Sequence, residues 1–122
     1  MNYNTKNIFE RSLATSAIKV LETADPCEKV NLSLLISQNW ANGGLIMIDN
    51  VTPPDYPARP VYPRLVDPKK VARRRINTAV PGKVALLHAL AHIELNAIDL
   101  AWDIIARFSC LELPKQFFTD WI

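Results

Sequence analysis

The sequence predicts an all-α protein, because apolar residues recur at helical spacing in three separate segments. The longest, residues 82–108 (GKVALLHALAHIELNAIDLAWDIIARF), carries a broad apolar side when it is placed on a helix at about 100° per residue. Two shorter segments with the same spacing precede it, residues 6–22 and the stretch between Asp25 and Asn42. Residues 51–68, here called the strap, hold six of the nine prolines and should therefore be extended.

Capping signals set the ends of the second helix. Asp25 and Pro26 form an N-cap followed by a proline in the first turn, and Glu28 stands three positions after the cap, as in a capping box. Gly43 follows the last apolar residue and can take the left-handed conformation that closes a helix. We therefore expect residues 1–50 to form an N-terminal helical pair.

The strap is expected to cross the surface without regular structure. Four of its apolar side chains could pin it to its own domain: Tyr56, Val61, Tyr62 and Leu65. The P-x-x-P spacing that begins at Pro54 would also suit a peptide that binds another protein, although packing on its own domain is the simpler interpretation.

The C-terminal part, residues 69–122, is expected to contain the long helix and the start of another. Asp67 and Pro68 repeat the cap-and-proline signal just before it, which predicts a short helical turn. Pro114 is well placed to open the last helix, which we expect to be truncated because domain ends are usually polar. Its aromatic side chains should be exposed and available to a partner: Phe117, Phe118 and Trp121.

Glu94 points most directly to a function. On the long helix it is surrounded by apolar residues: Leu87, Leu90, Ala91, Ile98, Ala101, Ile105 and Phe108. An ionised carboxylate on a buried helix face would lose several kcal/mol of hydration unless a cation or a strong donor met it. The pattern therefore predicts a buried carboxylate that binds a metal ion, pairs with an arginine at a helix contact, or carries a proton.

Two histidines and two aspartates lie on the other side of the same helix. His88 and His92, at i and i+4, could share a metal ion, although they project away from Glu94 by more than a quarter turn. Polar contacts between helices are the alternative for both imidazoles. Asp99 and Asp103 could orient these imidazoles or could simply be solvated.

Composition excludes several classes of protein. At 122 residues the chain is at most one small domain, and a hydrophobic content of 49% is high for that size. A net charge of +2 argues against nucleic acid or an anionic membrane as the main partner. No uninterrupted apolar run approaches the roughly 20 residues that span a bilayer, and the polar start MNYNTKNIFER lacks a secretory core, which predicts a cytoplasmic protein.

Two further classes find no support in the sequence. Cys27 and Cys110 form no C-x-x-C pair and are expected to be free thiols rather than zinc ligands or a redox pair. Three glycines and no glycine-rich phosphate loop argue against nucleotide binding.

Several runs of the sequence resemble a known family. The run LLHALAHIELNAIDLAWDIIARF, preceded by RRRINTAVPGK and followed by LPKQFFTDWI, is similar to an uncharacterised ferritin-like family whose members carry a domain of unknown function related to di-iron carboxylate proteins. The similarity extends back through LVDPKK, PARPVYP and ETADPCEKV and so covers most of the chain. Its H-x-x-x-H-x-E core consists of His88, His92 and Glu94. The resemblance implies that residues 1–122 form one incomplete ferritin-like domain, the N-terminal half of a helix bundle.

The resemblance also implies a function. Such bundles hold two iron or manganese ions through inward carboxylates and Glu-x-x-His pairs, and Glu94 matches the lone inward glutamate of a first bundle helix. Glu94 is therefore the expected metal ligand, with His92 and His88 as weaker candidates. The other ligands would come from the missing C-terminal half or from a homo-oligomer, so this chain alone is expected to bind metal weakly or not at all. Complete relatives would be oxidases or hydroxylases by analogy, and no catalytic residue is assigned here.

Two other hypotheses remain open at this point. The chain could be a metal-free helical interaction module that dimerises or docks onto a partner through its C-terminal aromatic residues. It could also be a gene remnant without function.

Overall fold

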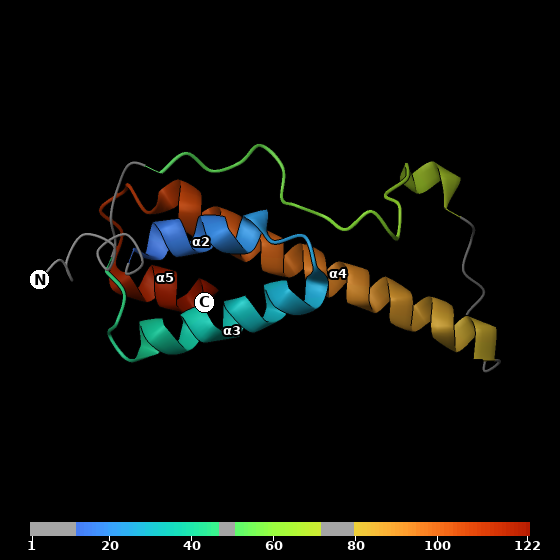
Figure 1. The fold of residues 1–122 in the computed structure, drawn as a ribbon, viewed down its shortest axis with the longest axis horizontal. Coiled ribbons are helices and arrows are strands. Elements are labelled where there is room, and N and C mark those ends of the chain that lie inside the picture. Colours follow the sequence, from blue (N-terminus) through green and yellow to red (C-terminus); the bar gives the residue numbers. More distant parts are fainter. Residues whose placement is uncertain (1–11, 47–50, 72–79) are drawn as a thin grey trace, which may run out of the picture.

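All regular structure in the described residues is helical, which confirms the predicted fold class. The computed structural model describes residues 12–46, 51–71 and 80–122. These residues form four α-helices and one 3-10 turn: α2 (Leu13–Glu22), α3 (Pro26–Ala41), η1 (Pro68–Lys70), α4 (Val80–Phe108) and α5 (Lys115–Trp121). Figure 1 shows α2, α3 and α5 gathered around the C-terminal half of α4, while its N-terminal half projects beyond them. The longest helix is therefore only partly covered.

The boundaries of α3 follow from its capping residues. The Asp25 carboxylate accepts a hydrogen bond from the backbone N–H of Glu28 at 2.9 Å, and Pro26 occupies the first turn. After the last turn Gly43 has a φ of 71°, and its N–H donates to the carbonyl of Trp40 at 3.0 Å. Residues with a Cβ are strained in this left-handed region, so glycine suits the position. Both predicted ends are confirmed.

Helix α2 packs on α4 over its whole length. Ser12 caps it by accepting a hydrogen bond from the N–H of Thr15 at 3.2 Å. One side of the helix is buried: Leu13, Ala14, Ala17, Val20 and Leu21. The predicted helix over residues 6–22 is thus confirmed from Leu13 onward, while residues 6–11 lie outside the described part of the chain.

The core lies where α2, α3 and α5 meet the C-terminal half of α4. It is formed by Leu13, Ala17, Val20, Leu21, Ile36, Trp40, Leu45, Trp102, Ile105, Ala106 and Phe118. The indole N–H of Trp102 donates to Ser33 Oγ at 2.7 Å, and that of Trp40 donates to Thr119 Oγ1 at 3.0 Å. Each large ring is therefore buried with its polar atom satisfied, which lets two tryptophans join α3 to α4 and to α5.

Helix α5 closes one end of this core. It begins directly after Pro114, as predicted. Phe118 is completely buried and Phe117 is half-buried, so the expectation that the C-terminal aromatic residues are all exposed is wrong. Only Trp121, at 40% exposure, fits that expectation. The short helix uses its aromatic residues to cover its own core, because α3 and α4 leave an apolar gap that Phe118 fills.

Three hydrogen bonds attach the backbone of the strap to the helices. The N–H of Ala58 donates to the carbonyl of Leu21 at 2.7 Å, and the Lys29 ammonium donates to the carbonyl of Ala58 at 3.0 Å. The Arg107 guanidinium donates to the carbonyl of Pro54 at 3.2 Å. The side chains predicted to pin the strap are exposed instead: Tyr56 at 85%, Val61 at 79%, Tyr62 at 69% and Leu65 at 64%. Extended proline-rich backbone keeps its carbonyls free as acceptors, and cations of α3 and α4 use them.

Replacing Ala58 by proline should loosen the strap. Proline has no N–H to donate to the Leu21 carbonyl, and a lost hydrogen bond of this kind costs about 1 kcal/mol. Transient release should make tryptic cleavage after Arg64 about fivefold faster, because proteolysis follows the open population. Tyr56→Pro, at an exposed strap residue, serves as the matched control. Equal cleavage rates for the two variants would show that the Ala58 contact does not hold the strap.

Helix α4 is also long and apolar enough to cross a membrane, judged by length and composition. Its most apolar window of 18 residues has a mean hydropathy of 1.4, and 6% of that window is buried. Core helices of bundles share this composition, and the C-terminal half of α4 packs against α2 in the described structure. The absence of a membrane partner remains a sequence-based prediction.

Candidate functional site

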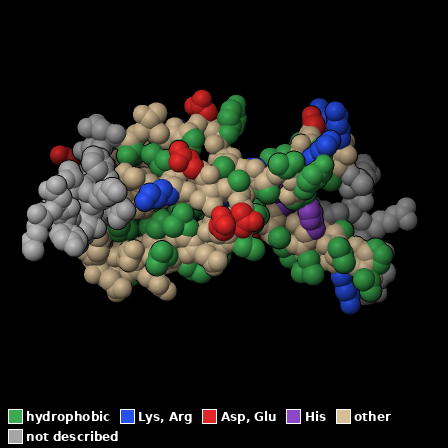
Figure 2. All heavy atoms as spheres, in the orientation of Figure 1, with side chains coloured by type: hydrophobic (Ala, Val, Ile, Leu, Met, Phe, Trp, Pro, Cys, Tyr) green, Lys and Arg blue, Asp and Glu red, His purple; other side chains and the backbone are tan. Residues whose placement is uncertain are grey.

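An apolar groove lies where the N-terminal half of α4 leaves the core. This histidine groove has a volume of about 620 Å³ and is lined by Pro26, Cys27, Val30, Asn31, Pro63, His88, Ala91, His92, Glu94, Leu95 and Ile98. Its walls come from the N-terminal end of α3, from the strap and from α4. Figure 2 shows hydrophobic side chains grouped over this end of the molecule, with a histidine side chain among them. All three residues predicted to bind metal therefore line one surface.

Glu94 lines the groove but is exposed. Among the described residues it forms no ion pair, and its exposure shows that the prediction of a carboxylate buried within this chain is wrong. Glu94 is exposed because α4 is rotated about its own axis so that another side of the helix faces the core. Its buried side passes through Asp99 and Trp102, and Asp99 is about 140° around the helix from Glu94. The apolar neighbours of Glu94 are accordingly exposed too, Leu87 at 66% and Leu90 at 46%.

The two histidines line the same groove as Glu94. His88 is exposed and His92 is half-buried, and both line the groove together with Glu94. On a regular helix His88 and His92 lie about 120° and 160° around the axis from Glu94, in keeping with the prediction that they project away from it. The groove is bounded by α3 on one side and by Pro63 of the strap on another, so it covers more than one side of α4.

The described residues do not complete a metal site. No three side chains of histidine, cysteine, aspartate or glutamate within residues 12–46, 51–71 and 80–122 are close enough to hold a metal ion. A pair of iron or manganese ions needs several carboxylates together with imidazoles. Glu94, His88 and His92 are of suitable chemistry, but their number is too small and they do not converge.

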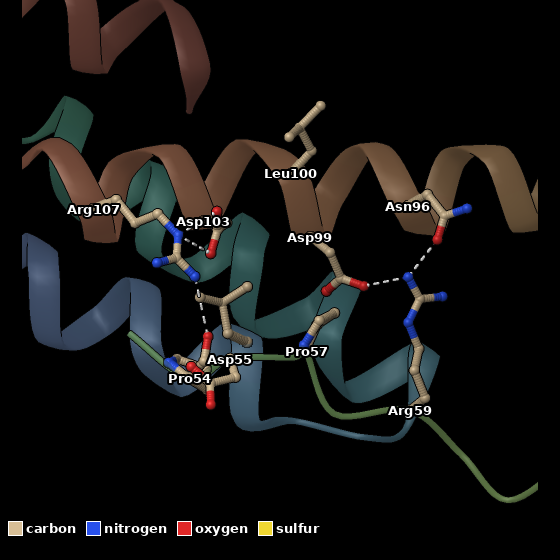
Figure 3. A pocket seen from close by; sticks show the side chains of 10 residues that line it. Pro54, Asp55, Pro57, Arg59, Asn96, Asp99, Leu100, Asp103 and Arg107 are labelled. Carbon is tan, nitrogen blue, oxygen red and sulfur yellow. Dashed lines mark hydrogen bonds and ion pairs between the residues drawn. The ribbon is translucent and has the colours of Figure 1, made fainter. Parts of the chain in front are cut away.

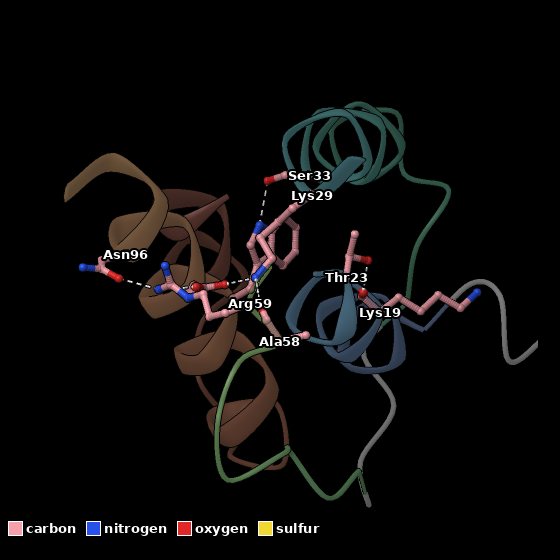
Figure 4. Close-up of polar contacts among 9 residues, drawn as sticks. Lys19, Thr23, Lys29, Ser33, Ala58, Arg59 and Asn96 are labelled. Atoms are coloured by element: carbon pink, nitrogen blue, oxygen red, sulfur yellow. Dashed lines mark hydrogen bonds and ion pairs between the residues drawn. The ribbon is translucent and has the colours of Figure 1, made fainter. Parts of the chain in front are cut away.

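The buried carboxylate of α4 is Asp99. It is 4% exposed, and its Oδ1 accepts a hydrogen bond from Lys29 Nζ at 2.5 Å (Figure 4). An Arg59 guanidinium nitrogen lies 2.6 Å from Oδ2 in an ion pair that lacks hydrogen-bond alignment. Arg59 also donates to Asn96 Oδ1 on the next turn of α4. The carboxylate thus joins three segments of the chain, α3 through Lys29, the strap through Arg59, and α4.

The burial of Asp99 differs from the sequence-based prediction. Solvation was the expected state of this aspartate, whereas its side chain and that of Lys29 are 6% and 1% exposed. The sequence does carry a signal for the buried lysine. Lys29 precedes the buried Ile36 and Trp40 by seven and eleven residues, which places all three on one side of α3. A cation on an apolar helix face predicts a buried acid, but it does not identify which one.

A polar cleft of about 300 Å³ lies between the strap and α4, and Asp99 is one of the residues that line it (Figure 3). Arg107 donates from Nε to both carboxylate oxygens of Asp103, at 2.9 and 2.8 Å. The hydrogen bond and the negative charge of Asp103 raise the pKa of Arg107, so this guanidinium stays charged. Because neighbouring groups already neutralise each other, the cleft resembles a structural ion-pair network rather than a catalytic site.

These features define an all-α protein. The C-terminal half of its long helix α4 packs against α2, α3 and α5, and the N-terminal half borders an apolar groove. The chain belongs to a protein family of unknown function, DUF455, whose sequence profile matches residues 22–122. An uncharacterised protein of Haemophilus influenzae is 39% identical over an alignment of 97 residues, and the match covers 72% of this chain and 32% of that protein. The chain therefore spans about a third of the length of this relative. No solved structure matches it.

Proposed function

We propose that the chain is one helical part of a larger ferritin-like di-iron carboxylate protein. In this proposal, further helices cover the N-terminal half of α4, and the histidine groove becomes the inner wall of a metal chamber. The observation that carries the proposal is the groove itself. A carboxylate and two imidazoles line a largely apolar surface on the N-terminal half of α4, where Val84, Leu87 and Leu90 are exposed.

Glu94 is the proposed ligand of an iron or manganese ion, with His92 and His88 as the next candidates. Carboxylate and imidazole donors suit both metals. The described residues do not complete the site alone, so the remaining ligands are assigned to helices outside this chain. When bound, a metal pair would supply redox chemistry. The role of this chain is to place one carboxylate and to exclude water through the apolar wall formed by Leu95, Ile98 and Val30.

The relative from Haemophilus influenzae supports a larger assembly, because about two thirds of its length lies outside the match. That additional length is enough for several helices. We assign the complete protein to the cytoplasm, in keeping with two exposed free thiols, Cys27 and Cys110. An oxidase or hydroxylase activity of the complete protein follows only by analogy with the fold class, and its substrate is left open.

Metal analysis of a reconstituted complex tests this function. The chain would be coexpressed with the portion of the Haemophilus influenzae relative that lies outside the matched 97 residues. Iron or manganese should copurify with the complex, and Glu94→Gln should lower the metal content at least about tenfold, because the amide loses the charge that binds the cation. Inductively coupled plasma mass spectrometry measures the metal per complex.

Glu112→Gln is the matched control, because Glu112 is an exposed glutamate that lies beyond the end of α4. It should leave the metal content unchanged. A complex that forms but contains no metal, or one that keeps its metal in the Glu94→Gln variant, would contradict the assignment of Glu94. Failure of the two parts to associate would contradict the proposed completion of the bundle.

A further inference from the structure

The strap borders both the polar cleft and the histidine groove. Arg59 lines the cleft, and Pro63, four residues later, lines the groove. Figure 1 shows the strap running from the covered half of α4 toward its projecting half. One extended segment therefore connects the ion pairs beside the core with the groove that contains His92 and Glu94.

Arg59 is the last residue of the strap that contacts an α-helix through a polar group in the described part of the chain. Its guanidinium donates to Asn96 Oδ1 and lies 2.6 Å from Asp99 Oδ2, both on α4 (Figure 3). Among the described residues, no hydrogen bond or ion pair joins residues 60–66 to an α-helix, and residues 61–66 are exposed. We call residues 60–66 the flap. The contacts of Arg59 are therefore those that most directly set the position of the flap.

The flap is long enough to lie beside His92. On a regular helix His92 is about 20° around the axis from Asp99 and about 10 Å before it along the axis. Four residues of extended chain span at most about 13 Å, which brings Pro63 from Arg59 to the level of His92. Pro63 and His92 line the same groove, and His92 is half-buried although the nearby His88 is exposed.

Arg59 can leave Asp99 without leaving a buried charge unpaired. Lys29 Nζ donates to Asp99 Oδ1 at 2.5 Å, and the Lys29 side chain is 1% exposed, so this pair stays neutral when Arg59 departs (Figure 4). The Arg59 side chain is already 17% exposed, and its approach to Oδ2 lacks hydrogen-bond alignment. Breaking a buried pair is costly because one charge remains in the interior, whereas a released arginine returns to water. Of the two cations, Arg59 is therefore the one that can be released.

We propose that the flap is a gate over the histidine groove and that Arg59 is its latch. In the closed state Arg59 contacts α4, and Pro63 forms part of the groove wall that His92 also lines. In the open state Arg59 is released, the pair of Lys29 and Asp99 stays intact, and the groove loses the wall at Pro63. The helices keep their packing in both states, because the described core contains no residue of the flap.

The gate rests on the function proposed above and deepens it, since it controls how a metal ion or another solute reaches His92. A closed flap shields one side of the groove, and an open flap admits solutes from that side. The experiment below uses thiol chemistry in the absence of metal. The gate and the metal site can therefore fail separately.

Alkylation of the His92→Cys variant tests the gate. The background is Cys27→Ser, Cys110→Ser, because both native thiols are exposed. His92→Cys in this background should react with N-ethylmaleimide at least about fivefold faster when Arg59→Gln is added, because glutamine cannot form the ion pair and the rate follows the open population. Mass spectrometry measures the modified fraction over time.

Three further variants serve as comparisons. Ile104→Cys, at a half-buried position of α4 that does not line the groove, should change its rate by less than about twofold when Arg59→Gln is added. Arg64→Gln, at an exposed arginine of the flap itself, should leave the rate of His92→Cys unchanged. Asn96→Ala removes the second acceptor of Arg59 and should raise that rate at least about twofold. It carries the test if circular dichroism shows that Arg59→Gln is unfolded.

Equal alkylation of His92→Cys with and without Arg59→Gln would overturn the gate. An equal rise caused by Arg64→Gln would do the same, because the effect would then not depend on the contacts of Arg59. A parallel rise at Ile104→Cys would indicate general loosening of the fold and would also overturn it. The expected rates in a protein that binds no metal would uphold the gate while contradicting the proposed metal site.

Discussion

Asp99→Ala is expected to lower the free energy of unfolding by about 3–5 kcal/mol, because it leaves the buried Lys29 ammonium without its carboxylate. Arg59 would lose the same partner and with it one attachment of the strap to α4. For a domain of this size such a loss is a large share of the total stability. Urea unfolding followed by far-UV circular dichroism measures the change.

Two controls separate the buried charge from simple loss of packing. The double variant Lys29→Met, Asp99→Leu removes both charges and should recover most of the lost stability, since a buried ion pair is often replaceable by apolar residues of similar volume. Asp103→Asn breaks a partly exposed pair with Arg107 and should cost less than about 1 kcal/mol. If the double variant were as unstable as Asp99→Ala, the unpaired lysine would not be the cause.

Trp102→Ala should be about as damaging, with a loss of about 3–5 kcal/mol. Trp102 is 2% exposed and packs where α2 and α3 meet α4, so its removal leaves a cavity that the neighbouring helices cannot fill. It also leaves the Ser33 hydroxyl without the indole donor. The same urea titration, with fluorescence from the remaining tryptophans, measures the effect.

The matched comparison for Trp102 is Trp121, which is 40% exposed at the end of α5. Trp121→Ala should cost less than half as much, in proportion to the smaller buried area. Trp102→Phe retains most of the ring and should lose about 1–2 kcal/mol through the missing indole donor and a smaller cavity. Similar losses for both alanine variants would contradict the position of the core around the C-terminal half of α4.

Much of the secondary structure could be predicted because it depends on local chemistry. The cap at Asp25, the left-handed residue at Gly43 and the proline starts at Pro68 and Pro114 each act within a few residues of the chain. A single sequence is sufficient to recognise such signals. The all-α class followed from them and from the apolar spacing.

The rotation of α4 could not be predicted in the same way. Its N-terminal half is apolar on nearly all sides, so a helical projection alone offers several possible buried faces. Glu94 looked buried because apolar residues flank it, but the side that packs on α2 and α3 is selected by contacts far away in the sequence. Asp99 is buried because Lys29 and Arg59 meet it, and these partners are 70 and 40 residues distant.

In the candidate site too, local features could be predicted from the sequence and long-range contacts could not. The residue types of Glu94, His88 and His92, and their place on one helix, could be predicted. Their common groove could not, because Cys27 and Pro63 of other segments form its remaining walls. The strap was placed on the surface correctly, but its attachment uses carbonyls of Pro54 and Ala58 rather than aromatic side chains, and backbone acceptors leave no sequence pattern.

The central claim is that α4 has one half stabilised by the described core and another that depends on additional helices. Amide hydrogen exchange of the monomeric chain at low concentration tests this most directly, because exchange reports the local free energy of opening. Amides of residues 84–95 should exchange at least about 100-fold faster than those of residues 102–106, and should become protected when a partner covers them. Equal protection of both halves in the monomer would contradict the claim.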